Sequence, residues 1–216
     1  ESALPFARAL ARSAHGKLVL VTVPPSEAAL VGLGPIEELD SAGRARRKGY
    51  LSDVRGRLAS DLPDRVSTEV LDGEVVSALL GVIDRRAPAL VVLATHGQGG
   101  DQRQWLGSVA EELLCRAAVP LLVVRPSSSS TEAGPDPDFR GGIVALDLSL
   151  PAELVLGPVR DLALATQSHV TLVHALDPVA PLPRDGRARL RGEAQRYLDR
   201  VADRLRDEGL RVATRV

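Results

Sequence analysis

The sequence is poor in cysteine and aromatic residues, and it contains no long apolar run. Its single cysteine, Cys115, excludes an internal disulfide and favours a reducing compartment, so we expect a cytoplasmic protein. Cys115 follows two leucines in a helical pattern, where we predict a small buried residue. No apolar run approaches the roughly 20 residues that a membrane span requires. The N-terminal residues also lack a secretory-signal pattern, so we expect no membrane partner.

Charge and motif content exclude further classes of protein. The chain has 27 Lys and Arg against 28 Asp and Glu, for a net charge of −1, which argues against a nucleic-acid partner. Aromatic residues make up only 2% of the chain, so the core has to be built from Leu, Val, Ile and Ala. The sequence has no Ser-His-Asp set, catalytic carboxylate pair or zinc-ligand spacing. We therefore expect neither an enzyme nor a metal site held by the protein.

Short β-branched runs alternate with helical patterns along the chain, which predicts an α/β protein with a doubly wound parallel sheet. Ser2 is the predicted N-cap of the first helix. We expect helices over 2–14, 74–85, 108–117, 154–165 and 184–208. A further long polar helix is expected to follow a loop at 26–34 and to end at about residue 60. We expect strands over 17–23, 67–71, 90–94, 120–124, 142–148, 169–175 and 210–216.

Two segments of the chain repeat one plan. The helix and strand within 2–23 match those within 151–175, and between the two segments lies a stretch of linker composition. We therefore expect a tandem repeat. The predicted domains are 1–126 and 139–216, joined by the linker 127–138. Each predicted domain has strands without a counterpart in the other, so we expect both domains to be incomplete.

One loop carries the residue types of an anion site. It runs from Ala94, at the end of a buried strand, to Ser108, at the start of a helix. Open α/β sheets bind ligands at the carboxyl ends of their strands, and a helix N-terminus favours a phosphate. Gly97, Gly99 and Gly100 allow the backbone to approach an anion closely. The alternative is a flexible connection in which Ser108 only caps the helix, and neither the Walker pattern nor GxGxxG fits this loop.

The glycine spacing in this loop, together with the apolar run that follows the next helix, resembles the motif of a known family. Gly97, nine residues and then Gly107-Ser108, followed by the run AVPLLVVRP at 118–126, resemble the universal stress protein family. The nucleotide motif of that family is Gly-x2-Gly-x9-Gly-Ser/Thr, and the resemblance covers almost the whole chain. It implies an adenine-nucleotide α-hydrolase-like sheet of order 3-2-1-4-5. It also implies binding of ATP, with Mg²⁺ or Mn²⁺ carried by the nucleotide, and a role in stress response or signalling with at most weak ATP hydrolysis.

The resemblance assigns site residues by position. Val23 would lie near the adenine, Gly73 would line the pocket, and Asp147 matches an aspartate that ends the first strand of a domain. His96 would contact a phosphate or have a structural role. The phosphates and ribose would lie along the loop and the helix start, at Ala94, Thr95, His96, Gly97, Gly100, Gly107, Ser108 and Val109.

The chain also departs from the family pattern. Ala94 stands where the motif has its first glycine, and Ala145 and Leu148 stand where the family usually has Pro and Gly. The first predicted domain lacks the opening strand with its aspartate, and the second lacks the glycine loop, so neither half is expected to hold a whole nucleotide site. We therefore also consider that strand 143–147 fills a central gap in the first sheet and brings Asp147 to the loop.

Two other functions stay open. One is a dimeric interaction module of the same fold that does not bind nucleotides. The other is an enzyme of the related α-hydrolase-like group, although the Ser-Gly-Gly type loop of that group is absent from the sequence. In the resembled family the last strand of a domain often pairs across a dimer. We therefore expect strand 120–124 to pair in a homodimer or a tandem pseudo-dimer.

Overall fold

The computed structural model describes residues 2–24, 36–95, 106–125, 137–176 and 184–216. The chain divides into two compact units, Glu1–Pro137 and Asp138–Val216. All strand pairs in the described residues are parallel, and helices connect the strands. The prediction of an α/β fold with parallel sheets is therefore confirmed.

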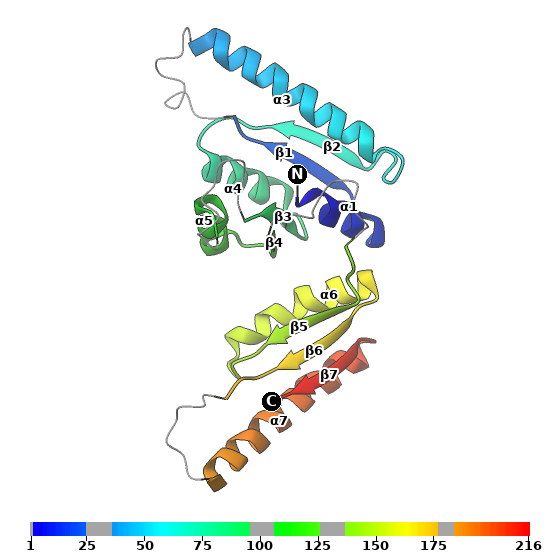
Figure 1. Ribbon diagram of the computed structural model, residues 1–216, viewed down its shortest axis with the longest axis vertical. Helices are drawn as coiled ribbons and strands as arrows, with labels where there is room; N and C mark the ends of the chain where they lie inside the picture. Colours follow the sequence, from blue (N-terminus) through cyan, green and yellow to red (C-terminus); the bar gives the residue numbers. More distant parts are fainter. Residues whose placement is uncertain (1, 25–35, 96–105, 126–136, 177–183) are drawn as a thin grey trace. The chain divides into compact units, whose positions relative to one another are not determined.

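The first unit contains two pairs of parallel strands (Figure 1). β1 (Leu18–Thr22) pairs with β2 (Val66–Val70), and β3 (Val91–Ala94) pairs with β4 (Leu121–Val124). β1, β3 and β4 are short runs rich in valine and leucine, as expected for strands of a parallel sheet, whereas β2 (VSTEV) has polar residues at its centre. The carboxyl end of β3 leads into the loop that the sequence marks as a ligand site.

In the described part of the first unit these strands are accompanied by the helices α1 (Leu4–Ser13), α3 (Ile36–Leu58), α4 (Val75–Arg86) and α5 (Ser108–Arg116). α3 packs along β1 and β2 through buried Leu51, Val54 and Leu58. α4 and α5 pack together around Val76, Ile83 and Leu113, with β3 and β4 contributing further apolar side chains. These aliphatic clusters fix where α5 begins relative to the end of β3.

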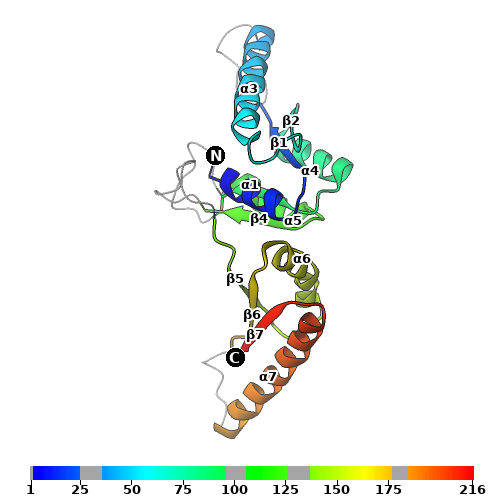
Figure 2. The ribbon, with the colours of Figure 1, turned by 90° about the vertical axis from the view of Figure 1, so that its right-hand side faces the viewer.

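The second unit is a three-stranded parallel sheet in the order β5-β6-β7 (Figure 2). Its strands are β5 (Gly141–Ala145), β6 (His169–Val173) and β7 (Arg211–Arg215). Its helices are the short 3₁₀ turn η1 (Pro151–Val155), α6 (Leu156–Thr166) and α7 (Arg184–Asp207). Side chains of α6 and α7 pack onto one face of the sheet and form the core. Within the described residues, no helix is both long and apolar enough to cross a membrane.

Three local predictions are wrong. The N-cap of α1 is Ala3 and not Ser2, because the helix starts two residues later with Pro5 in its first turn. Cys115 is exposed, because α5 buries Ala110 and Leu113, and a residue two positions further lies on the opposite side of a helix. The helix expected over 154–165 begins at Leu156 instead, because residues 151–155 form the 3₁₀ turn η1, which Pro151 starts.

The strand pairing also answers one hypothesis from the sequence. β5 is hydrogen-bonded to β6 in a sheet of its own, whereas β3 is hydrogen-bonded to β4. A strand that filled a central gap beside β3 would need both of its edges there. β5 therefore does not take that position in this structure. Most of the predicted linker 127–138 lies outside the described residues.

Candidate functional site

The candidate site is centred on the residue that follows β3. Thr95 is 5% exposed, and it continues the ladder because its N–H donates to the carbonyl oxygen of Val124 at 2.9 Å. The carbonyl oxygen of Thr95 accepts the N–H of Gly107 at 2.8 Å. These two bonds tie the end of β3 both to β4 and to the residue that starts α5. The two ends of the loop are thus held together.

The first turn of α5 presents backbone N–H groups at this place. Gly107 is the N-cap, with φ −77° and ψ 154°, and its carbonyl oxygen accepts the N–H of Glu111 at 2.9 Å. A helix leaves its first N–H groups without intrahelical partners. The N-cap residue is a glycine, so it has no side chain to cap this helix end. The first-turn amides of α5 therefore receive no hydrogen bond from a side chain of their N-cap residue.

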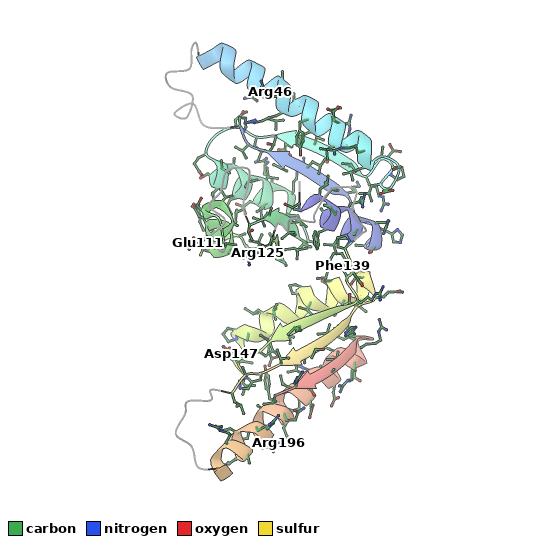
Figure 3. The ribbon with its side chains drawn as sticks, in the orientation of Figure 1. Arg46, Glu111, Arg125, Phe139, Asp147 and Arg196 are labelled. Atoms are coloured by element: carbon green, nitrogen blue, oxygen red, sulfur yellow. The ribbon has the colours of Figure 1, made fainter. Side chains whose placement is uncertain are left out.

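The two residues after Gly107 have different surroundings. Ser108 is exposed, so its hydroxyl is available to a ligand. Val109 is partly buried and packs against the α4–α5 cluster, which fixes the orientation of the first turn. Glu111 is exposed in that same turn, and Figure 3 shows it on α5. A carboxylate near a helix N-terminus interacts favourably with the helix dipole, and it would oppose a second negative charge there.

In the neighbouring helix α4, the first-turn N–H groups are bonded by the side chain of the N-cap residue. Glu74 is its N-cap, and the carboxylate accepts N–H groups from Val76 at 3.1 Å and Ser77 at 2.8 Å. The bond from the Ser77 N–H is the largest cause that lowers the pKa of Glu74 below its usual value. The first-turn amides of α4 are thus occupied. At these two helix starts, the N-cap residue of α4 caps its own helix, whereas the N-cap residue of α5 has no side chain to do so.

The turn before α4 contains the predicted site residue Gly73. Gly73 has φ +99°, a left-handed conformation that glycine adopts without steric cost. Its neighbour Asp72 accepts a bond from Arg44 of α3 at 3.1 Å. Val23, another predicted site residue, follows β1 and is partly buried. Val23 and Gly73 therefore belong to the β1–β2 pair and not to the β3–β4 pair.

Asp147 serves as a local turn former at the end of β5, where Figure 3 marks it. Its Oδ1 accepts the N–H of Ser149 at 2.9 Å. Hydrogen bonds from Ser149 are the largest cause of the lowered pKa of Asp147. Between them, Leu148 adopts φ +69°, a left-handed conformation that is rare for a branched side chain. The Asp147 carboxylate thus stabilises the turn that leads into η1.

The described site residues fall into three places: the β3–α5 junction, the ends of β1 and β2 with Val23 and Gly73, and the turn after β5 with Asp147. The structure brings together Ala94, Thr95, Gly107, Ser108 and Val109 at the β3–α5 junction. His96, Gly97 and Gly100 lie outside the described residues. Where the chain is described, no group of three His, Cys, Asp or Glu side chains is placed to hold a metal ion. Sequence reasoning did not identify Glu74 as a helix cap, because glutamate is not among the usual N-cap residues.

Comparison with known proteins points to one family. Residues 1–125 match the model of the Universal stress protein family. A curated universal stress protein of Methanocaldococcus jannaschii is 32% identical over 69 residues. These residues are 32% of this chain and 41% of that protein, so the match spans less than half of its length.

Solved structures share the fold over almost the whole chain. A universal stress protein from Archaeoglobus fulgidus has a TM-score of 0.69 at 16% identity, covering 99% of this chain and 72% of that one. A structure of the same description from Pseudomonas aeruginosa has a TM-score of 0.52 at 15% identity, covering 95% of this chain and 76% of that one. At these identities the likeness concerns the fold alone.

Proposed function

This chain belongs to the universal stress protein family, and from that premise we propose that it binds an adenine nucleotide at the β3–α5 junction. The nucleotide is ATP, accompanied by the Mg²⁺ or Mn²⁺ that its phosphates carry. The bound nucleotide changes the conformation or the partners of the protein in a stress response or signalling. In this proposal the protein is not an enzyme, and hydrolysis of ATP is at most slow.

One observation carries the proposal: α5 begins beside the end of a partly buried parallel strand, and its N-cap residue is a glycine, which has no side chain to cap the helix. Backbone N–H groups and the helix dipole together favour a phosphate at such a place. α4 provides the comparison, because the Glu74 carboxylate already occupies the equivalent amides there. A carboxylate on α4 and a phosphate on α5 would satisfy the same kind of donor.

The proposed roles of the residues follow from their places. The amides of Ser108 and Val109 and the hydroxyl of Ser108 would donate to phosphate oxygens. The bond between Gly107 and Thr95 would hold these donors in position before the ligand arrives. The described residues gather no metal-binding group, so the divalent cation would be held mainly by the phosphates. Gly97 and Gly100 would let the loop backbone approach them.

The test is an isothermal titration of the 216-residue chain with ATP and Mg²⁺, alongside Gly107→Asp and Gly107→Asn variants. We expect a micromolar Kd for the parent, which corresponds to about −8 kcal/mol. Asp and Asn are both good N-caps, so both variants should retain the helix. Only the Asp side chain adds a negative charge where the phosphate would lie.

The two variants separate electrostatics from shape. Loss of binding in Gly107→Asp, with a smaller loss in Gly107→Asn, supports a phosphate at this helix start. Equal affinity in all three proteins would place any bound nucleotide elsewhere. No heat signal from the parent at millimolar nucleotide would overturn the proposal. Circular dichroism spectra of the three proteins check that the fold is retained.

One observation favours a second candidate function, that of an interaction module without a nucleotide. Within the described residues, β4 pairs only with β3, so its other edge carries no ladder partner. An open edge of this kind is a template for pairing with another strand. The second candidate is therefore a homodimer or tandem pseudo-dimer that pairs through 120–124. Light scattering after size exclusion, with and without ATP, tests it: a dimer that persists in Val123→Pro would exclude this edge.

A further inference from the structure

α3 carries a dense run of positive charge. Four of the five residues over 44–48 are basic, and Arg55 and Arg57 follow in the last turn of the helix. Asp53 is the only acidic residue within 43–58, the part of α3 whose side chains the structure describes. The near balance of charge over the whole chain therefore does not extend to this helix, and it does not exclude a polyanionic partner there.

The first unit gives these charges few partners of opposite sign. Side chains three and four residues apart on a helix are neighbours. No acidic residue stands at that spacing from Arg46, Lys48 or Arg55, all of which are exposed. Within the described residues, none of these three side chains takes part in an ion pair. Arg44 and Lys48 are four residues apart, a spacing at which like charges destabilise a helix.

The equivalent helix of the second unit has acidic residues one turn away from its arginines. α7 connects β6 to β7 as α3 connects β1 to β2. In α7, Arg189 pairs with Glu193 at 3.1 Å and Arg206 pairs with Asp203 at 2.8 Å. A long arginine-rich helix in this place can therefore pair its charges along its own length. The run on α3 lacks such pairs, which indicates a role outside the fold.

The apolar side of α3 is already covered. Leu51, Val54 and Leu58 are buried, on the side of the helix that packs along β1 and β2. An amphipathic helix binds a membrane surface by inserting its apolar side among the lipids. The described part of α3 has no apolar side left to insert, so its basic side does not suit a membrane.

The basic side chains form two rows on the exposed side of α3, where Figure 3 marks Arg46. Successive residues of an α-helix are about 100° apart, which places Arg46 and Arg57 in one row, together with Asp53. Lys48 and Arg55 form the other row. The exposed residues between the rows are small: Ala45, Gly49, Ser52 and Gly56. A linear polyanion that lies between the rows would have positive charge on both sides.

Tyr50 favours one kind of polyanion. Its side chain is 44% exposed, and it follows Arg46 by one turn in the same row. An aromatic ring beside basic residues provides a surface on which an unpaired base stacks while the basic groups contact the phosphates. An acidic peptide has no base to stack on the ring, and the bases of a duplex are already stacked on one another.

We propose that the exposed side of α3 binds single-stranded nucleic acid, with phosphates along the two rows and a base stacked on Tyr50. These contacts involve the backbone and the faces of bases, so the binding does not depend on sequence. The surface shares no residue with the β3–α5 junction, and its activity goes beyond the proposed binding of ATP. For this helix it replaces the expectation, drawn from the overall charge, that the chain has no nucleic-acid partner.

The test is a fluorescence anisotropy titration of a labelled oligo-dT of about 20 nucleotides with the 216-residue chain, at several salt concentrations between about 50 and 200 mM. We expect Arg46→Gln with Arg55→Gln to raise the Kd about tenfold. The slope of log K against log salt should fall by about 1.4, because each phosphate contact on a single strand contributes about 0.7. Tyr50→Ala should raise the Kd about tenfold and Tyr50→Phe should not, since phenylalanine retains a ring for stacking.

Two further variants distinguish this surface from positive charge in general. Arg196→Gln with Arg200→Gln removes the same number of exposed arginines from α7, and it should leave the Kd and the salt slope unchanged. Asp53→Asn removes the negative charge from the first row and should lower the Kd. Glutamine is a good helix former, so both double variants should retain the fold, which circular dichroism and urea unfolding check.

Several outcomes would overturn the proposal. One is no change of anisotropy at about 0.1 mM protein in low salt. Others are an equal loss of affinity in the two double variants and an unchanged Kd in Tyr50→Ala. Displacement of the oligomer by poly-glutamate as efficiently as by unlabelled oligo-dT would assign the surface to an acidic protein instead. A large loss of stability in Arg46→Gln with Arg55→Gln would mean that these arginines serve the fold.

Discussion

The N–H of Gly107 donates to the carbonyl oxygen of Thr95 at 2.8 Å, and this bond joins the start of α5 to the end of β3. Thr95 is itself bonded to Val124, so the helix start is fixed to both strands of the pair. The loop between these residues is therefore closed at its base. A ligand at the first turn of α5 would meet donors that are already in place.

We predict that Gly107→Pro destabilises the first unit by about 1 to 3 kcal/mol, because it leaves the buried Thr95 carbonyl without its partner. The backbone angle φ −77° suits proline, so loss of the N–H is the main change. Gly107→Ala is the matched control, since it retains the N–H and its φ and ψ are accessible to alanine. Amide hydrogen exchange of β3 and α5 measures the difference. Equal protection in the two variants would contradict this role of the bond.

A substitution in the turn at Leu148 is expected to stabilise the protein, in contrast to Gly107→Pro. Leu148 has φ +69°, which costs an L-residue about 1 to 2 kcal/mol, and its side chain is 38% exposed. Glycine removes that cost but loses about 0.5 to 1 kcal/mol of backbone entropy. We therefore expect Leu148→Gly to stabilise the second unit by up to about 1 kcal/mol. Hydrogen exchange of the β6 amides measures this.

Leu150 provides the control for that change. It has φ −60° and is 81% exposed, so Leu150→Gly relieves no strain and removes little packing. We expect this variant to be destabilised slightly. If both glycine variants lose stability to the same extent, the left-handed conformation at Leu148 does not store the strain that we assign to it.

Much of the fold was predictable because the periodic signals are strong. β1 was expected over 17–23 and is found at Leu18–Thr22, and α7 was expected over 184–208 and is found at Arg184–Asp207. The long helix also buries an apolar stripe that recurs at helical spacing in the sequence, at Ala194, Leu198, Val201 and Leu205. Leu190, which belongs to the same stripe, is 41% exposed. Periodicity predicts toward which side of the helix a side chain points, but it does not predict how far along the helix the sheet extends to cover it.

The candidate site was less predictable, because its geometry rests on backbone groups. No residue type in the sequence predicts that the carbonyl oxygen of Thr95 accepts the Gly107 N–H. Glu74 caps α4 although it is outside the usual set of capping residues. Asp147 was assigned by resemblance to a nucleotide site, and in the structure its carboxylate bonds the Ser149 N–H. Each of these roles depends on local backbone angles, which composition and spacing do not determine.

The cap at Glu74 predicts a pH dependence of the first unit. Its pKa is lowered from 4.5, with the Ser77 N–H bond as the largest cause, so the folded protein favours the ionised carboxylate. This contribution is present above about pH 4.5 and is lost as the pH falls through the lowered pKa. We expect Glu74→Gln, which retains an acceptor for the amides, to flatten that part of the profile. Urea unfolding followed by circular dichroism at several pH values measures it, and identical profiles would contradict the prediction.

The contact between α7 and η1 predicts an alkaline transition in the second unit. The Tyr197 hydroxyl donates to Glu153 at 2.8 Å, and Arg204 donates to the same carboxylate at 2.6 Å. Burial, and then the bond to Glu153, raise the pKa of Tyr197 from 10.0 to about 12. A raised pKa means that this stabilisation is present below about pH 10 and is lost as the pH rises through 12.

The absorbance of tyrosinate measures this transition directly. The chain has two tyrosines, so a Tyr50→Phe variant leaves Tyr197 as the only one that titrates. We expect its midpoint near pH 12, and a lower midpoint that stays above 10 when Glu153→Gln is added, because burial is the larger cause. Circular dichroism of the same samples shows over which pH range the fold persists. A midpoint near pH 10 in the folded Tyr50→Phe protein would mean that Tyr197 is neither buried nor bonded to Glu153 in solution.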